Sequence, residues 1–177
     1  MVDRGNPQAP IVAIGEAPGE NEDLQGKAFV GRAGQLLDKI MQSIGVDTNK
    51  DMLILNVVKC RPPENRAPKP QEVENCFPFL EWQLGFVKPK LILLLGATAA
   101  KHLIPDQRDT NMKDRVGQFF DLEKVPGVKF MLLYHPAFLL RDPRKKKDMW
   151  EHVQILRKFL ETAGLCSTPM PAQPNFL

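Results

Sequence analysis

The chain of 177 residues has few cysteines and no long apolar run. Its 3 cysteines lie far apart, and its start shows no signal-peptide pattern, so we expect a cytoplasmic protein with reduced thiols. A membrane-spanning helix would need about 18 or more consecutive apolar residues, and the sequence contains no such stretch. No internal repeat or low-complexity block is visible.

The length and charge of the chain set modest bounds. A chain of this length can bury its own hydrophobic core, and we expect one domain at residues 1–165. The remaining tail, residues 166–177, is rich in proline and is expected to be disordered. A net charge of +3 permits a nucleic-acid partner without establishing one.

Short apolar segments alternate with helix-like segments along the chain. Strands are expected at residues 10–14, 52–58, 89–95 and 129–134, and helices at residues 33–44, 71–85, 97–104 and 145–163. The alternation predicts an α/β fold with three α/β/α layers, in which a four-stranded parallel sheet lies between helices. The crossover connections should be right-handed. Residues 105–128 lack this pattern and are expected to form a hairpin or a loop.

The first strand and the turn after it are the stretch around which the chain is organised. Residues 11–14 have the pattern of a buried strand of a parallel sheet, which Gly15 and Pro18 end. The spacing of Gly15 and Gly19 matches neither the dinucleotide-binding fingerprint nor a P-loop, because no Lys-Ser or Lys-Thr follows. Taken alone, the turn is compatible with any strand–helix unit.

Polar residues follow this strand at the place where α/β proteins bind ligands. Ligands of open α/β sheets lie beyond the carboxyl ends of the strands, and here that rim carries Glu16, Glu22 and an exposed-looking Phe29. Gly34 then lies at the start of a helix whose first amides are suited to an anion. We therefore expect the site at this rim.

Two later strands end in residues that suit the same rim. Asn56 follows the second strand, and His135 follows the last one. Because His135 directly precedes a proline, its backbone should be extended. Parallel strands bring their carboxyl ends together, so these side chains should converge. His102 and His152 fall within helical patterns and are interpreted as surface or packing residues.

Two basic or glycine-containing segments are candidates for phosphate contacts. Residues 56–70 carry four prolines and a net positive charge, which predicts an irregular basic loop, with a merely solvated loop as the alternative. The helix start at Gly96 offers free amides to a DNA phosphate, and tight packing of strand against helix is the alternative there.

The segment at residues 134–150 combines apolar and cationic side chains. Leu139 and Leu140 lie beyond a turn and are followed by Arg141 and the basic run 144–147. An apolar tip flanked by cations can wedge a base stack while the cations hold phosphates. The alternative for the charge run is a solvated helix start.

Three strings carry a family resemblance, and they occur in order along residues 5–160. They are GEAPGENED followed by GKAFVGRAGQLLD, then NVVKCRPPENRAP, and finally HPAFLLRDP. They resemble the motifs of family 4 uracil-DNA glycosylases, the iron-sulfur branch of the uracil-DNA glycosylase superfamily. The resemblance implies hydrolysis of the bond between uracil and deoxyribose in single- or double-stranded DNA, leaving an abasic site for base excision repair.

The resemblance also implies roles for residues at the rim. Phe29 would stack on a uracil flipped out of the DNA, and Asn56 would pair with the edge of the base. Glu22 would close the pocket beside C5 against the methyl group of thymine. His135 would donate a hydrogen bond near O2 as the uracil anion leaves.

A general base is harder to assign. The better-known branch of the superfamily has an Asp where this chain has Ala17, which would lie in the uracil pocket without a carboxylate. If the bond breaks dissociatively, water adds without strong activation and stabilisation of the leaving anion matters more. Glu16 is the nearest alternative base. Contacts to DNA are assigned to Gly34, Arg61, Gly96, Leu139, Leu140 and Arg141.

The cysteines are expected to concern a cofactor. By resemblance, Cys60 and Cys76 are two of the four thiolate ligands of a 4Fe-4S cluster. The family carries a further C-x-x-C pair upstream of the first strand, and this chain starts too late to include it. Cys166 could supply at most a third ligand, so the expected cluster is incomplete or absent, and small apolar packing of the two thiols is the alternative.

Two other classes of function are compatible with the sequence, and it also allows predictions about the oligomeric state and the partners of the chain. One rival is a non-catalytic DNA-binding module of the same fold, and the other is an enzyme for free nucleotides, which would not need an apolar wedge. The expected state is a monomer without membrane contact. The tail ends in QPNFL, which loosely resembles sliding-clamp-binding peptides, with a frayed terminus as the alternative.

Overall fold

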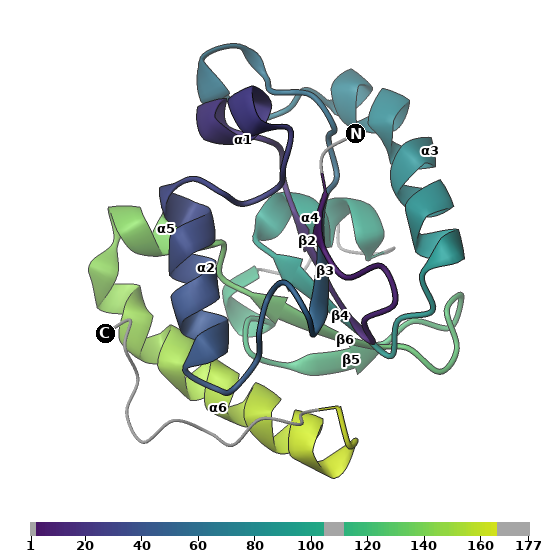
Figure 1. Ribbon diagram of the computed structural model, residues 1–177, viewed down its shortest axis with the longest axis vertical. Coiled ribbons are helices and arrows are strands. Elements are labelled where there is room, and N and C mark those ends of the chain that lie inside the picture. The colour runs from purple at the N-terminus through teal and green to yellow at the C-terminus, as the bar shows by residue number, and fades with distance from the viewer. Residues whose placement is uncertain (1–2, 105–111, 166–177) are drawn as a thin grey trace.

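The computed structural model describes residues 3–104 and 112–165. This part of the chain forms a mixed sheet of six strands in the order β1-β3-β2-β4-β6-β5, with helices on both faces (Figure 1). The predicted three-layer α/β/α class is therefore confirmed. The predicted tail, residues 166–177, lies outside the described residues.

The four predicted strands form the centre of the sheet and run parallel. They are β2 (Ile11–Gly15), β3 (Met52–Asn56), β4 (Leu91–Leu95) and β6 (Lys129–Leu133). Every residue of β2, β3 and β4 is buried, as expected of parallel strands that are covered on both faces. Each of these strands begins and ends within two residues of its predicted bounds.

The predicted number of four strands is wrong because two short strands extend the edges of the sheet. β1 (Arg4–Gly5) pairs antiparallel with β3, and β5 (Phe119–Asp121) pairs antiparallel with β6. Strands of two and three residues are too short to show an alternating pattern in the sequence. β5 lies in the segment expected to contain a hairpin, and with β6 it forms one.

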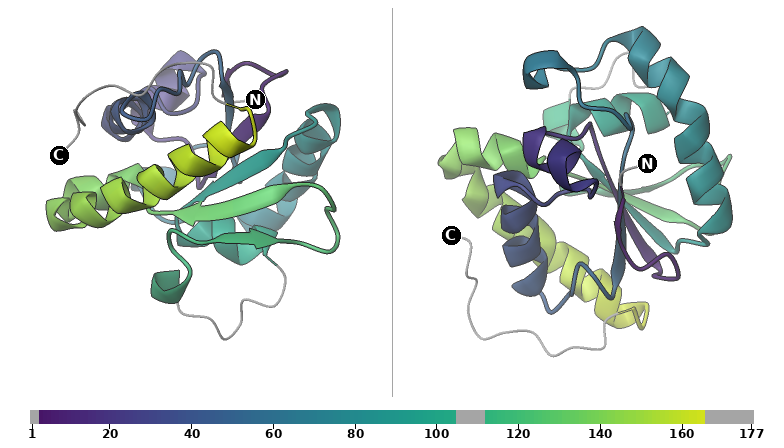
Figure 2. Two further views of the ribbon diagram at one scale, coloured as in Figure 1. Left: turned by 90° about the horizontal axis from the view of Figure 1, so that it is seen from below. Right: turned by 45° about the horizontal axis from the view of Figure 1, so that its top comes forward.

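The helices form two layers around the sheet (Figures 1 and 2). They are α1 (Glu20–Gln25), α2 (Arg32–Gln42), α3 (Pro70–Phe86), α4 (Ala97–Leu103), α5 (Pro136–Arg141) and α6 (Lys146–Thr162), with short 3-10 segments at Pro63–Asn65, Met112–Asp114 and Pro143–Lys145. The four predicted helices are present, whereas the short α1 and α5 were not predicted. No helix in the described ranges is long and apolar enough to cross a membrane.

Each layer is held by an apolar stripe at helical spacing. Ile40 of α2 and Met149 and Val153 of α6 belong to the core on one face of the sheet. Val73 and Leu80 of α3 belong to the core on the other face. Apolar side chains three and four residues apart share one face of a helix, which is why these sequences could be recognised as helices.

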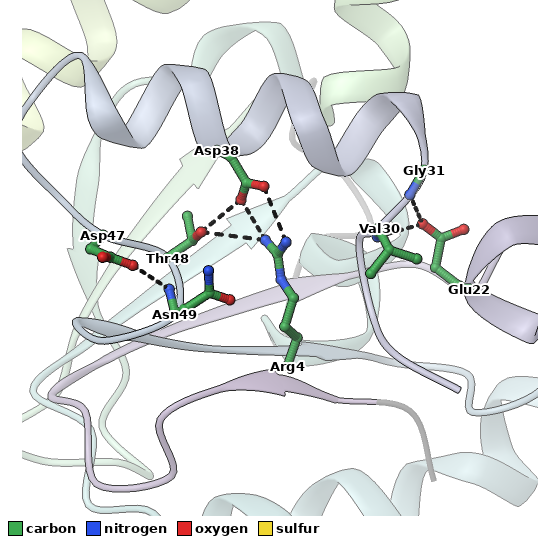
Figure 3. A network of polar contacts seen from close by, with 8 residues as sticks. All are labelled: Arg4, Glu22, Val30, Gly31, Asp38, Asp47, Thr48 and Asn49. Carbon is green, nitrogen blue, oxygen red and sulfur yellow. Dashed lines mark hydrogen bonds and ion pairs between the residues drawn. The ribbon is translucent and has the colours of Figure 1, made fainter. Parts of the chain in front are cut away.

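The first edge strand is tied to the helical layer by a polar network (Figure 3). The Arg4 guanidinium donates to both carboxylate oxygens of Asp38 on α2, at 3.1 and 2.5 Å, and the Thr48 hydroxyl donates to the same carboxylate at 2.6 Å. A bidentate pair of this kind fixes geometry as well as adding energy. β1 therefore has a defined position despite its length.

Candidate active site

A cavity of about 1020 Å³ opens at the carboxyl ends of the parallel strands. Ligand sites of small molecules usually have volumes of this order or smaller. The cavity is lined by residues from several separate segments, among them the predicted pocket residues Glu16, Ala17, Glu22, Phe29, Asn56 and His135. The sheet thus brings together predicted pocket residues that lie up to 119 positions apart in the sequence, from Glu16 to His135.

Asn56 places a buried amide without a partner in the wall of this cavity. It is the last residue of β3, is only 1% exposed, and neither Nδ2 nor Oδ1 has a hydrogen-bond partner in the described structure. A buried polar group without a partner costs roughly 1–3 kcal/mol, so such groups are rare in folded proteins. An unpaired amide that faces a cavity is suited to a ligand with one donor and one acceptor.

Gly15 makes room for the side chains of Asn56 and Phe29. It pairs in register with Asn56 on the neighbouring strand. A Cβ atom at Gly15 would lie 2.7 Å from Asn56 Oδ1 and 2.5 Å from Cζ of Phe29. Both distances are shorter than real Cβ contacts, so any larger residue would displace the two side chains. The sequence marked Gly15 only as a turn residue.

Phe29 is held in place by an unusual backbone and by Glu22. Its φ of 54° lies in the left-handed region, and its side chain is 5% exposed, so the expectation of an exposed Phe29 is wrong. Oε1 of Glu22 accepts hydrogen bonds from the amides of Val30 at 2.8 Å and Gly31 at 2.7 Å (Figure 3), and Oε2 accepts from Gly19 at 3.2 Å. Glu22 therefore clamps the loop that carries the aromatic ring.

His135 faces the Phe29 ring, at a distance of 5.5 Å between ring centroids. Its Nδ1 accepts a hydrogen bond from the amide of Ala137 at 3.1 Å, so in the neutral ring the proton resides on Nε2. Burial, with a smaller contribution from the nearby Arg141, lowers the pKa of His135 to about 4, against the opposite effect of Glu22. The imidazole is thus neutral near pH 7 and keeps one N–H to donate.

Comparison with known proteins identifies the family. The family model "Uracil DNA glycosylase superfamily" matches residues 2–159. The chain belongs to this superfamily. The resemblance drawn from the three sequence motifs is confirmed.

Curated relatives narrow the comparison within the superfamily. The chain is 42% identical over 176 residues to the type-4 uracil-DNA glycosylase of Archaeoglobus fulgidus, a match that covers 98% of this chain and 85% of the relative. It is 36% identical over 166 residues to that of Thermotoga maritima, covering 93% and 84%. It is 43% identical over 143 residues to that of Pyrobaculum aerophilum, covering 78% and 72%.

The only carboxylate predicted as a base in this glycosylase fold is engaged with a neighbour. The Glu16 carboxylate accepts a hydrogen bond from the hydroxyl of Thr98, a cavity residue that was not predicted individually. Ala17 lines the cavity next to it, and its side chain carries no polar group. The bond to Thr98 fixes the direction of the Glu16 side chain.

Two glycines predicted to contact DNA serve packing in the structure. The amide of Gly96 itself donates to the carbonyl of Leu133 at 2.9 Å, so this one amide of the helix start is not free for a phosphate. A Cβ atom at Gly34 would lie 1.7 Å from the carbonyl oxygen of Phe29. Gly34 is buried, and its lack of a side chain lets α2 approach the backbone of Phe29.

The predicted apolar tip contains one leucine instead of two. Leu139 is 0% exposed and belongs to the core, whereas Leu140 is 36% exposed. Successive residues of a helix point about 100° apart, so α5 turns Leu139 inward when it turns Leu140 outward. Arg141 remains exposed and lines the cavity.

The basic loop after β3 is held by polar contacts. Arg61 donates to Asn65 Oδ1 at 2.7 Å and lies 3.7 Å from a carboxylate oxygen of Glu20. The Arg66 guanidinium donates to both carboxylate oxygens of Glu72, at 2.8 and 2.6 Å, and these bonds lower the pKa of Glu72 to about 2. The cavity wall therefore includes Asn65 and Arg66, which the sequence reasoning did not single out.

His152 is a further cavity residue that the sequence did not reveal. Its ring centroid lies 5.8 Å from that of Tyr134, and both residues line the cavity. The expectation of a surface or packing role is thus incomplete, because α6 turns His152 toward the rim. A histidine within a regular helical pattern carries no sequence signal of this kind.

The cysteines described in the structure do not by themselves fit a four-thiolate cluster. Cys60 is exposed, Cys76 is partly buried, and both are free thiols. Within residues 3–104 and 112–165, no group of three or more potential metal-ligating side chains occurs. Cys166 lies outside these ranges. Two thiolates are half of what such a cluster normally needs.

Proposed function

We propose that this chain is a monofunctional uracil-DNA glycosylase, which hydrolyses the N-glycosidic bond of deoxyuridine in DNA and leaves an abasic site. Its curated relatives carry the name type-4 uracil-DNA glycosylase. The single observation that best supports the proposal is the buried, unpartnered amide of Asn56 beside the rings of Phe29 and His135. These groups match a base with two polar edges and two flat faces.

Uracil would be recognised after the nucleotide has flipped out of the stack. Flipping costs a few kcal/mol, which contacts in the pocket must offset. The Phe29 ring would stack on the base, and the Asn56 amide would donate from Nδ2 to O4 and accept at Oδ1 from N3–H. Cytosine presents the reverse pattern, so a fixed amide would reject it. Glu22 would close the pocket beside C5.

His135 would stabilise the leaving base. The glycosidic bond breaks with negative charge developing on O2 of uracil, and the Nε2–H of His135 would donate to that oxygen. The bond from the Ala137 amide holds Nδ1 as the acceptor, so the donor is already in place before the reaction. A preorganised donor of this kind contributes about 2.7–4 kcal/mol to the transition state.

The water that attacks the sugar needs less assistance than the leaving base. No carboxylate stands at Ala17, and the oxocarbenium-like sugar reacts readily with water. Glu16, which Thr98 holds in one direction, is proposed to orient that water. Stabilisation of the uracil anion remains the larger contribution in this scheme.

Contacts to the rest of the DNA are proposed for the exposed side of the rim. Leu140 would act as the wedge that fills the gap in the base stack, with Arg61 and Arg141 near the phosphates. Gly34 and Gly96 would contribute to DNA binding indirectly, because the close packing at each glycine positions the neighbouring residues of the rim. Binding to single- or double-stranded DNA, a monomeric state, a cytoplasmic location and a clamp contact of the tail remain predictions from the sequence.

A 4Fe-4S cluster is proposed only as a property of the family. Cys60 and Cys76 would be two of its ligands, and the described residues offer no complete set. No step of the mechanism depends on the cluster.

The proposal is tested with an oligonucleotide that contains one uracil. The chain is incubated with it, abasic sites are cleaved with alkali, and the fragments are separated by length. A cleaved product from uracil but not from the matched thymine oligonucleotide supports excision. Binding without cleavage would favour the alternative, a non-catalytic DNA-binding module. A non-catalytic module would not explain why the buried Asn56 amide has no hydrogen-bond partner among the described residues.

A further inference from the structure

Lys59 is a buried lysine three positions after Asn56. Lys59 is only 9% exposed, whereas lysines usually keep their ammonium group in water. Within the described ranges, Lys59 forms no direct ion pair with a carboxylate.

The ammonium group instead donates to two neutral oxygens. Nζ of Lys59 lies 2.6 Å from the backbone carbonyl oxygen of Asn56 and 2.5 Å from Oε1 of Gln83 on α3. Gln83 is itself buried and donates from Nε2 to Asp3 at 3.4 Å. The lysine thus links the end of β3 to the helix on one face of the sheet.

These contacts hold one particular peptide group from both sides. The peptide that joins Asn56 to Val57 has its carbonyl bound to Lys59, and its N–H donates to the carbonyl of Gly15 at 3.0 Å. Rotation of this peptide would break both bonds. Among residues 3–104 and 112–165, the Asn56 side chain has no hydrogen-bond partner, so the direction of its amide depends on the backbone that carries it.

We propose that Lys59 is a positioning residue for Asn56, which fixes the backbone of Asn56 so that the amide faces the base in one orientation. The inference rests on the proposed excision of uracil and assigns a part of its specificity to a residue that does not line the cavity. A buried cation is a costly choice where an apolar side chain would pack, which is the physical reason to expect a role beyond stability.

A double-mutant cycle tests the proposal. Single-turnover rates of uracil release are measured, with enzyme in excess, for the wild type, Lys59→Met, Asn56→Ala and the double variant. Lys59→Met keeps the apolar stem and removes the donor, and it should slow release roughly 10-fold or more. In the Asn56→Ala background the same change should cost less than about 2-fold, since the residue through which Lys59 acts is gone. Exposed Lys88→Met serves as the matched control and should behave as wild type.

Stability must be separated from positioning. Lys59→Met leaves the Gln83 oxygen without a donor, so Lys59→Met/Gln83→Leu is prepared as well, which removes both ends of that hydrogen bond and leaves only the Asn56 carbonyl without its donor. This variant should unfold at a temperature close to that of the wild type and still release uracil slowly. Equal losses in both Asn56 backgrounds, or an unchanged rate in Lys59→Met, would overturn the proposal.

A measurement that does not need activity keeps the two proposals apart. The side-chain amide signals of Asn56 are followed by NMR in 15N-labelled wild type and in the Lys59 variants. Positioning predicts that they shift or broaden in both Lys59 variants and stay unchanged in Lys88→Met. Unchanged signals would refute the role of Lys59, even if the wild type released no uracil and the proposed function itself had failed.

Discussion

Replacing His135 by alanine removes the donor that would face the leaving base. The Nε2–H is held in place by the bond between Nδ1 and the Ala137 amide at 3.1 Å, so the variant loses a donor that needs no reorganisation. The excision rate should fall roughly 10²- to 10³-fold, which corresponds to about 2.7–4 kcal/mol. Binding of uracil-containing DNA should change little, because the donor acts on charge that develops only as the bond breaks.

The assay for this variant combines kinetics with binding. Single-turnover release of uracil gives the rate of the chemical step, and a titration with labelled DNA gives Kd. His102→Ala is a suitable control because His102 lies on α4 and does not line the cavity. We expect the control to match the wild type in both measurements.

The protonation of His135 provides an independent check. Burial lowers its pKa from 6.5 to about 4, so the unfolded chain binds a proton between these pH values that the folded chain does not bind. Stability should therefore fall as the pH drops from about 6.5 to about 4 and should be unaffected by this group above that window. The loss is at most about 3 kcal/mol and should disappear in His135→Ala.

NMR of the imidazole nitrogens can decide the question directly. The ring should titrate well below pH 6.5 and should carry its proton on Nε2 in the neutral form. A proton on Nδ1, an ordinary pKa, or an unchanged excision rate in His135→Ala would refute the reasoning. A proton on Nδ1 would mean that the bond to Ala137 does not set the tautomer, an ordinary pKa would mean that burial does not act on the ring as described, and an unchanged rate would remove His135 from the mechanism.

Three further predictions concern the base edge, the phosphates and the thiols. Asn56→Asp removes the donor to O4 and places a carboxylate there, so uracil excision should fall by the equivalent of at least about 1–3 kcal/mol; retained activity would show that the base is read elsewhere. Neutralising residues 145–147 should weaken DNA binding for any sequence and reduce the logarithmic salt slope by up to about one unit per lost contact, with the smallest share from Lys145, which already pairs with Asp148 at 2.8 Å. A slope equal to that of the wild type would assign these lysines to a solvated surface. Purified without oxygen, the 177-residue chain should contain far fewer than the roughly four irons of a complete cluster; iron analysis that finds the full number would require ligands other than the described cysteines.

The sequence alone was enough to predict those parts of the fold that depend on residues adjacent in the chain. Residues 11–14 and 91–95 are short apolar runs that end at Gly15 and Gly96, and they form β2 and β4 as this pattern predicts. The order of such strands and helices also placed Asn56 and His135 at strand ends, and hence at one rim. The motifs identified the family for the same reason: each is a short stretch of consecutive residues, which can be recognised without knowledge of the tertiary structure.

Contacts between distant segments were decided only by the tertiary structure. The sequence could not show that Leu139 turns into the core, that the Gly96 amide binds Leu133, or that β1 and β5 complete the sheet. These outcomes depend on which surfaces meet, and a short strand or a single helical turn carries too little pattern to reveal its partner.

The chemistry of the site depends on the same distant contacts. Asn56 was recognisable as a residue at a strand end, but its lack of a partner becomes visible only when its neighbours are in place. The pKa and tautomer of His135 follow from burial and from the Ala137 amide, and the burial of Lys59 follows from its approach to Gln83 on α3. Solvent exclusion and hydrogen-bond geometry belong to the assembled molecule, whereas the identity and order of the residues that meet at the rim belong to the sequence.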